Sequence, residues 1–214
     1  ELGKPIVPNR PSASGGTVER YSIAPALPAG LLLDAVTGVI SGTPTTVVPS
    51  TVHVVTAENG ALVIRDAGGC TVWWKERLTA PVEIEYEARV VMAGGSFDRL
   101  SDLNCFWMAS DPKHPEDLFV DSQKRAGSFP KYDPLRTYYV GYGANENATT
   151  RFRRYPRSRD DEGLKPEFDL SDAKYMNVPN KTVKITLEAD GHTIRFLRDG
   201  EVIFTFEDPQ PYEE

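Results

Sequence analysis

The chain has 214 residues with 17 Gly, 17 Pro, nine Tyr and nine Phe, a composition typical of short strands joined by tight turns. Its 24 Lys and Arg against 31 Asp and Glu give a net charge of −7. This charge argues against nucleic acid as a partner, because phosphate binding relies on excess positive charge. No apolar run approaches the roughly 20 residues that span a bilayer, so no transmembrane segment is expected. The chain begins at Glu1 without an apolar leader, as a mature secreted chain does.

The first part, residues 3–59, is rich in Pro, Gly, Ser, Thr and Val and almost free of Lys and Arg. Alternating apolar and polar residues predict strands over 17–23 and 51–56. Between them lie a Pro-x-Leu-Pro-x-Gly-Leu run beginning at Pro25 and a Thr-Gly-x-Ile-x-Gly-Thr-Pro run beginning at Thr37. These runs resemble the signature of the Putative Ig repeat family of bacterial surface and secreted proteins. The resemblance implies an Ig-like spacer over 1–59 that lacks catalytic residues.

Beyond residue 60, Trp, Tyr, Phe, Arg and Asp become frequent, which indicates a second part over 60–214. Strands are expected over 62–64, 71–75, 82–92, 103–108, 136–142, 149–155, 182–189, 193–198 and 201–206. The pairs Asp190-Gly191 and Asp199-Gly200 predict tight hairpins between the last three of these strands. Two irregular stretches, 111–132 and 156–179, have the length of functional loops. The expected fold class is therefore all-β, a meander of antiparallel strands.

Several motifs of this second part together resemble an uncharacterised domain family encoded beside polysaccharide-degrading enzymes. They are Trp73-Trp74, the strand around Asn104, Tyr138-Tyr139-Val140-Gly141, the Arg-rich strand 149–154 and the closing run 198–209. The resemblance implies a concanavalin-like or glucanase-like antiparallel β-sandwich, a jelly roll. That family continues past an Asp-Pro-x-Pro-Tyr element, matched at Asp208 to Tyr212, into further strands. Two alternatives follow: the jelly roll is C-terminally truncated, or another element covers the sheet edge that the absent strands would leave exposed.

Strand parity predicts a binding face, because residues two apart share one side of a sheet. Polar and aromatic residues recur with this period on three expected strands, and Arg99 lies just before them. Such residues stack on sugar rings or pair with hydroxyl and carboxylate groups. The expected ligand is a polysaccharide or oligosaccharide, with uronate-containing glycans as the first class to test. The candidate ligand-binding residues are Arg99, Asp102, Asn104, Arg136, Tyr138, Tyr142, Arg151 and Arg153. The alternative is a solvated face whose charges pair with one another.

Catalytic and metal-binding alternatives stay open. Glu83, Glu85 and Glu87 alternate on one strand with the spacing of an inverting carboxylate pair, but the same alternation is typical of a wet strand face. His114 is a candidate loop-borne base of a lyase, with Tyr138 as its acid or base. Structural calcium at Asp98, Asp102 or Asp117 is chemically plausible, although no ligand spacing supports it, and no cofactor is expected.

Two further features leave alternatives open. Cys70 and Cys105 either pair or stand as two thiols on β-strands. Of Trp73 and Trp74, adjacent on an expected strand, one can enter the core while the other faces outward as a sugar platform.

The sequence thus predicts a glycan-binding β-sandwich associated with polysaccharide use. The expected location is secreted, periplasmic or cell-surface. A polysaccharide lyase or glycoside hydrolase on the same jelly roll is the first alternative, and a purely structural surface or adhesion module is the second.

Overall fold

The computed structural model describes residues 3–10, 21, 27–45, 53–58, 61–66, 68–156 and 166–213. The chain divides into two compact units. The first comprises Glu1–Cys70 with Asp121–Gly127, and the second comprises Thr71–Val120 with Ser128–Glu214. The expected strand over 17–23 lies almost entirely outside the described residues. The proposed division of the chain after residue 59 stays a prediction.

Within its described residues, the first unit contains two antiparallel pairs of strands and a short helix. Strand β1 (Leu31–Leu33) pairs with β2 (Ile40–Gly42), and β3 (His53–Glu58) pairs with β4 (Ala61–Asp66); α1 spans Ser122–Arg125. Gly30 and Gly42 have positive φ angles of 92° and 123°, and a Cβ on either would collide with the facing backbone. The β1–β2 pair therefore requires glycine at both positions of the Ig-like motif.

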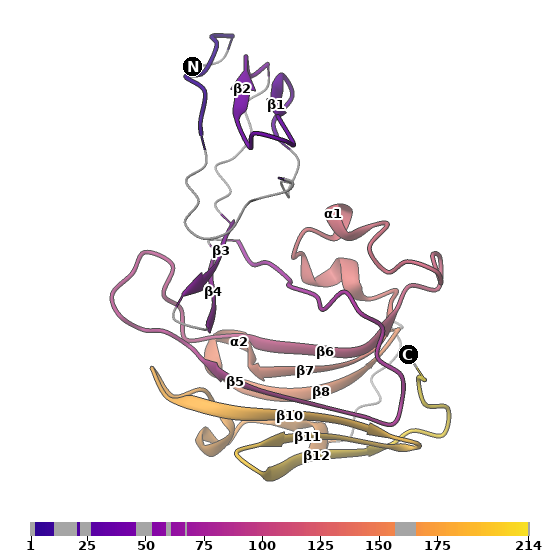
Figure 1. Ribbon diagram of the computed structural model, residues 1–214. Helices are drawn as coiled ribbons and strands as arrows, with labels where there is room; N and C mark the ends of the chain where they lie inside the picture. The colour runs from indigo at the N-terminus through magenta and orange to yellow at the C-terminus, as the bar shows by residue number, and fades with distance from the viewer. Residues whose placement is uncertain are drawn as a thin grey trace. The chain divides into compact units, whose positions relative to one another are not determined.

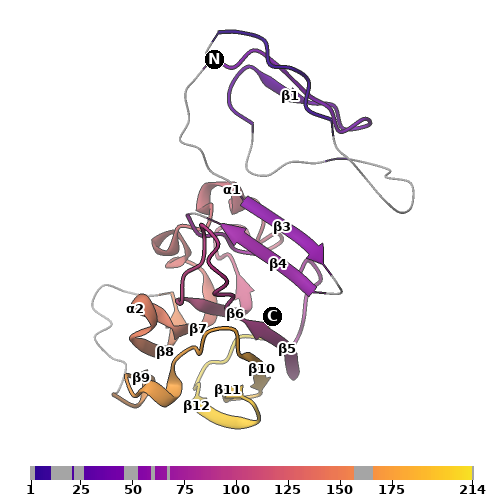
Figure 2. The same cartoon turned by 90° about the vertical axis from the view of Figure 1, so that its left-hand side faces the viewer.

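The second unit is a sandwich of two four-stranded antiparallel sheets (Figures 1 and 2). One sheet has the order β12-β11-β10-β5, from β5 (Val82–Arg89), β10 (Thr182–Asp190), β11 (Thr193–Arg198) and β12 (Glu201–Glu207). The other has the order β6-β7-β8-β9, from β6 (Leu103–Ser110), β7 (Arg136–Gly143), β8 (Thr149–Tyr155) and β9 (Asp169–Leu170). Neighbouring strands in each sheet run antiparallel.

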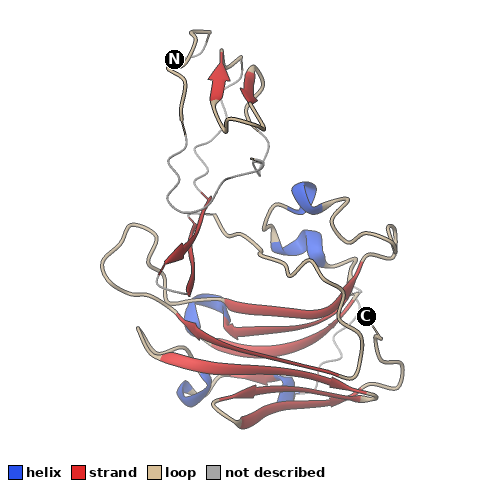
Figure 3. Cartoon of the chain, in the orientation of Figure 1, coloured by secondary structure: helices blue, strands red, loops and turns tan. Residues whose placement is uncertain are grey.

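Helices are confined to single turns in the described residues (Figure 3). In the second unit they are α2 (Ala144–Asn147), η1 (Phe129–Tyr132), η2 (Pro166–Phe168) and η3 (Ala173–Tyr175). Among the residues that the structure describes, none of these helices is long and apolar enough to cross a membrane. The expectation of an all-β fold is confirmed.

The hydrophobic core lies between the two sheets. On β5, apolar residues alternate strictly with three exposed glutamates, so the apolar side faces the partner sheet. Phe152, Ile185, Ile194 and Phe196 have no exposed surface and form the centre of this core. Burying each such side chain contributes about 1.5–3 kcal/mol, so the alternation determines which side of each strand turns inward.

Most of the expected strands are present. The Asp199-Gly200 turn joins β11 to β12 as predicted, with both residues at positive φ, as a two-residue hairpin requires. Three other features differ from the prediction. The β10–β11 loop lies one residue later than expected, since Asp190 still pairs with Thr193. Residues 71–75 form a loop rather than the expected strand, and β9, inside the irregular stretch 156–179, was not predicted.

Candidate functional site

The sheet β6-β7-β8-β9 has one face in the core and one face outside it. Trp107 pairs with Tyr138, and Val140 pairs with Phe152; all four are buried in the core. Their sequence neighbours point to the other side, because successive strand residues alternate between faces. We call this opposite side the outer face. It carries Asn104, Phe106, Thr137, Tyr139, Gly141, Arg151, Arg153 and Tyr155.

A cluster of aromatic rings covers the middle of the outer face. Phe106 and Tyr139 lie side by side on β6 and β7 with ring centroids 5.0 Å apart. Phe129 and Tyr132 of η1 pack onto them, at 5.0 Å from Tyr139 and 5.4 Å from Phe106. Trp73 adds a ring 5.8 Å from Phe106. The expected open polar face is therefore replaced here by a second, smaller packed layer, because the loops fold back over the sheet.

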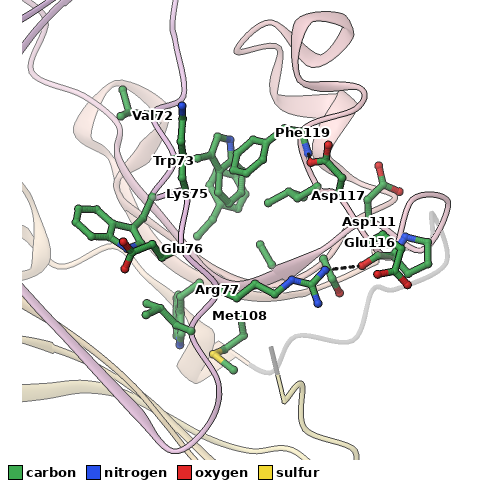
Figure 4. A pocket seen from close by; sticks show the side chains of 18 of the residues that line it. Val72, Trp73, Lys75, Glu76, Arg77, Met108, Asp111, Glu116, Asp117 and Phe119 are labelled. Atoms are coloured by element: carbon green, nitrogen blue, oxygen red, sulfur yellow. Dashed lines mark hydrogen bonds between the residues drawn. The ribbon is translucent and has the colours of Figure 1, made fainter.

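A pocket of about 320 Å³ lies beside β6, and we call it the β6 pocket. It is lined by residues 72–78 of the loop before β5, by 106–111 of β6 and its end, by 115–119 and by Ile84 (Figure 4). Arg77 reaches across from the first segment, and its Nη2 donates a hydrogen bond of 2.9 Å to the Pro115 carbonyl. This bond ties together two of the three segments that form the pocket.

Aromatic side chains supply much of the pocket wall. Trp73, Phe106 and Phe119 line it together with Trp74, which is 71% exposed. An exposed Trp beside a pocket offers a flat apolar surface with a polar edge, which suits stacking on the apolar side of a sugar ring. Trp73 is partly buried against Phe106 and Tyr132 rather than in the core between the sheets, Trp74 is exposed, and both lie on a loop and not on the expected strand.

Charged groups complete the lining. Asp111 is 4% exposed and its Oδ1 accepts a hydrogen bond of 2.9 Å from the Lys113 N–H. Asp117 Oδ1 accepts one of 2.7 Å from the Phe119 N–H. Glu76 and Glu116 are exposed. The lining thus carries four carboxylates but only two cationic side chains. The carboxylates belong to Glu76, Asp111, Glu116 and Asp117, and the cations to Lys75 and Arg77.

Two of the three sheet arginines predicted to bind ligand, Arg151 and Arg153, have a protein partner. Arg153 Nη2 donates to both oxygens of Asp169, at 2.9 Å and 2.8 Å, and Arg151 Nε lies 3.3 Å from Asp169 Oδ1. Strand β9 brings Asp169 beside them, because Arg151 and Asp169 are cross-strand neighbours. A guanidinium nitrogen that donates to both carboxylate oxygens makes a charge-assisted pair, which is stronger than a neutral hydrogen bond. These contacts match the alternative in which the charges of this face pair with one another.

Asn104 and Tyr139 also bind each other on the outer face. The Tyr139 hydroxyl donates to Asn104 Oδ1 at 3.0 Å, over Gly141, where a Cβ would collide with that hydroxyl. Burial, followed by the neighbouring Tyr155, raises the pKa of Tyr139, so its hydroxyl stays protonated and donates. Nearby, Arg99 Nη2 lies 3.4 Å from Asp102 Oδ2 in an exposed pair.

The expected placement of Tyr138 and Tyr142 on the binding face is wrong. Both belong to the core, with exposures of 0% and 2%, and the Tyr142 hydroxyl donates to the Met176 carbonyl at 3.1 Å. Arg136 shares their side of β7 but is exposed at its first residue. Parity correctly grouped these three residues, but it could not decide their side, because β7 carries buried residues on both faces.

The buried Tyr138 hydroxyl anchors the C-terminal segment. It donates to Asp208 Oδ2 at 2.7 Å and accepts a 3.1 Å hydrogen bond from the Tyr212 N–H. Arg154 Nε donates to the same Asp208 oxygen at 2.6 Å, and the Gln210 N–H donates to Oδ1 at 2.9 Å. Burial alone would raise the pKa of Asp208, but the hydrogen bonds from Arg154, Gln210 and Tyr138 hold it below its usual value. The Asp-Pro-x-Pro-Tyr element therefore has a structural role.

The burial of Tyr138 also removes the acid or base that was expected to act with His114 in a lyase. The alternating glutamates of β5 point away from the core, and Glu85 Oε2 lies 2.8 Å from Lys184 Nζ on the neighbouring strand. This arrangement matches a solvent-exposed strand face rather than a catalytic carboxylate pair.

The structure also shows the surroundings of the calcium candidate Asp98 and of the two cysteines. The Asp98 carboxylate accepts hydrogen bonds from the Ala93 and Gly95 N–H groups at 2.5 Å and 3.0 Å, which hold the chain in a turn. Cys70 and Cys105 are both free thiols.

Sequence reasoning missed the polar and aromatic residues that line the β6 pocket outside the sheet. Lys75, Arg77, Glu116 and Phe119 lie on loops, where side-chain direction follows no period. The available signals were the Trp73-Trp74 pair and the length of the stretch 111–132, and neither shows that these two loops meet beside β6.

Comparisons with known proteins agree with this architecture. The family model "Domain of unknown function (DUF6250)" matches residues 64–214, and the model "Putative Ig domain" matches residues 2–65. No curated protein matches the chain. A crystal structure of a protein of unknown function with a galectin-like fold from Bacillus subtilis is 15% identical, with a TM-score of 0.50 over 74% of this chain and 72% of that chain. This likeness concerns the fold alone and confirms the expected jelly-roll class; the two family matches confirm both expected resemblances.

Proposed function

The chain belongs to the DUF6250 family, and from this premise and the geometry of its sandwich we propose that it is a secreted glycan-binding protein. Its Ig-like part is proposed to serve as a spacer that presents the sandwich to polysaccharide. Periplasmic and cell-surface placement are included in the proposal. We also propose that this glycan-binding protein works beside polysaccharide-degrading enzymes.

The β6 pocket is the observation that carries this proposal. It combines the exposed ring of Trp74 with several carboxylates, in a volume of about 320 Å³. Ligand pockets span roughly 300–1,000 Å³, so this one suits a short stretch of sugar chain. Aromatic stacking contributes affinity, and carboxylates accept hydrogen bonds from sugar hydroxyls.

Of the residues predicted from the sequence, those that remain exposed are proposed only as a secondary contact area. Arg99 and Asp102 lie just before β6 and Asn104 lies on it; Arg151 and Arg153, which are only partly exposed, lie on β8, on the far side of β7. Their internal pairs would have to open, or accept a further partner, before they bind a glycan.

The test is affinity electrophoresis of the full chain in native gels that contain neutral or acidic plant and algal polysaccharides. The same mixtures are followed for absorbance near 235 nm, which detects the unsaturated ends made by lyases, and for new reducing ends. Retardation without cleavage supports the proposal. New ends would replace it with an enzyme, and neither retardation nor cleavage in any gel would contradict it in favour of a structural module.

A further inference from the structure

We propose that the β6 pocket binds uncharged sugar rings and discriminates against rings that carry carboxylate groups. This inference names the ligand class of the proposed glycan site, and it therefore rests on the proposed function. It differs from the uronate class that the sequence suggested.

The first argument is the charge of the lining. Four carboxylates face two cationic side chains, which leaves the lining with an excess of negative charge: Glu76, Asp111, Glu116 and Asp117 against Lys75 and Arg77. Charges separated by less than the screening length of about 8 Å at physiological salt repel one another appreciably, and apolar walls strengthen the repulsion. A uronate carboxylate entering this volume would meet that excess.

The second argument is hydrogen-bond chemistry. An ionised carboxylate only accepts hydrogen bonds, so a carboxylate of the pocket cannot bond to a uronate carboxylate but can accept from a sugar hydroxyl. Asp111 and Asp117 are held in place by the N–H groups of Lys113 and Phe119, which fixes these acceptors before any ligand arrives. Neutral sugars, whose polar groups are hydroxyls, match this lining.

The third argument is the position of the cations. One N–H of Arg77 is already directed at the Pro115 carbonyl, and the exposed Lys75 carries a single positive charge. The arginine pair best suited to a carboxylate, Arg151 and Arg153, is bound to Asp169 and does not line the pocket. No forked guanidinium pair is thus assembled in the pocket to recognise a uronate.

The apolar wall completes the match. Trp74 lines the pocket and is 71% exposed, and its sequence neighbours Lys75 and Glu76 are exposed as well. A neutral pyranose can place its C–H face on this ring while its hydroxyls reach the carboxylates.

The experiment compares one polysaccharide in two chemical forms. Polygalacturonan and the same polymer after chemical reduction of its carboxyl groups have the same linkages but differ in charge. Both are run with a panel of neutral glucans, galactans, mannans and xylans, using the full chain in affinity electrophoresis and then titration calorimetry. We expect binding to at least one neutral polymer, at least tenfold weaker binding to the acidic form than to the reduced form, and a smaller difference in 1 M salt, where screening is strong.

Three variants locate the effect. Trp74→Ala should weaken binding to the neutral polymer about tenfold, because it removes the stacking surface. Glu116→Gln should raise affinity for the acidic form about threefold or more, since it removes one repelling charge. Val202→Ala, an exposed aliphatic substitution on β12 of the other sheet, is the matched control and should bind as the parent does.

The outcomes separate the two proposals. Equal or tighter binding of the acidic form would overturn the ligand class and leave glycan binding intact. Undiminished neutral binding by Trp74→Ala would overturn the pocket as the site. Absence of binding to every polymer would contradict the proposed function and this inference with it.

Discussion

The hydroxyl of Tyr138 offers a direct test of which side of β7 faces the core. Tyr138→Phe removes a hydroxyl that donates to the carboxylate of Asp208 at 2.7 Å and accepts from the Tyr212 N–H at 3.1 Å. A hydrogen bond to a charged group contributes about 1.5–3 kcal/mol, and an N–H left without its acceptor costs about 1 kcal/mol. Asp208 keeps Arg154 and Gln210 as donors. We therefore expect the free energy of unfolding to fall by about 2.5–4 kcal/mol.

The matched control is the next residue along the strand. Tyr139→Phe removes a hydroxyl of a ring that is just as deeply buried, 3% exposed, but its partner Asn104 is exposed and can bind water instead. Its expected cost is about 1 kcal/mol or less. The contrast between two adjacent tyrosines thus depends on the two faces of the sheet and not on tyrosine burial in general.

Urea unfolding followed by tryptophan fluorescence measures both variants. The three tryptophans are Trp73, Trp74 and Trp107, all in the second unit, so the signal reports that unit. The free energies follow from linear extrapolation to zero denaturant. A cost for Tyr138→Phe no larger than that for Tyr139→Phe would refute the placement of Tyr138 against Asp208.

Three other expectations concern single groups. Folding lowers the pKa of Asp208, so the contribution of its carboxylate to stability is present above about pH 4 and is lost as the pH falls through the folded pKa. In urea titrations from pH 6 to pH 2, the difference in free energy of unfolding between the parent and Asp208→Asn should therefore shrink. A difference that stays constant would contradict this expectation. Burial raises the pKa of the Cys105 thiol to about 11, and burial together with Asp66 raises the pKa of Cys70. Ellman's reagent at pH 8 should therefore react with at most one thiol, Cys70, in the native chain and with two thiols in urea. Two reactive thiols in the native chain would show that the core is open, and none in urea would show a disulfide. Glu85→Gln, at an exposed ion pair, should leave the urea midpoint and glycan retardation unchanged, and a loss of retardation would reinstate the β5 glutamates as site residues.

Local patterns were sufficient where one physical rule governs a segment. On β5 the alternation of Ile84 and Tyr86 with glutamates leaves a single way to bury the apolar side. The Asp199-Gly200 turn follows from the positive φ angles that a two-residue hairpin needs. Gly30 and Gly42 of the Ig-like motif are required by a close backbone approach.

Patterns were insufficient where two faces compete. Tyr138 and Tyr139 are adjacent, aromatic and buried, so parity separates them but does not say which one enters the core. The cross-strand register decides it, because Tyr138 pairs with Trp107 and Tyr139 with Phe106. The sheet also lacks the fully open polar face that was expected, because the loops that carry Trp73 and Phe129 cover part of it.

The sequence by itself therefore determined the all-β class, the strands of the sandwich except β9, the hairpin between β11 and β12 and the family resemblances, because these depend on neighbours along the chain. Only the tertiary structure decided which side of β7 is buried, that Asp169 binds Arg151 and Arg153, and that residues 72–78, 106–111 and 115–119 enclose one pocket. Those features depend on contacts between segments distant in sequence, whose energies come from packing and charge pairing in three dimensions and leave no period in the chain.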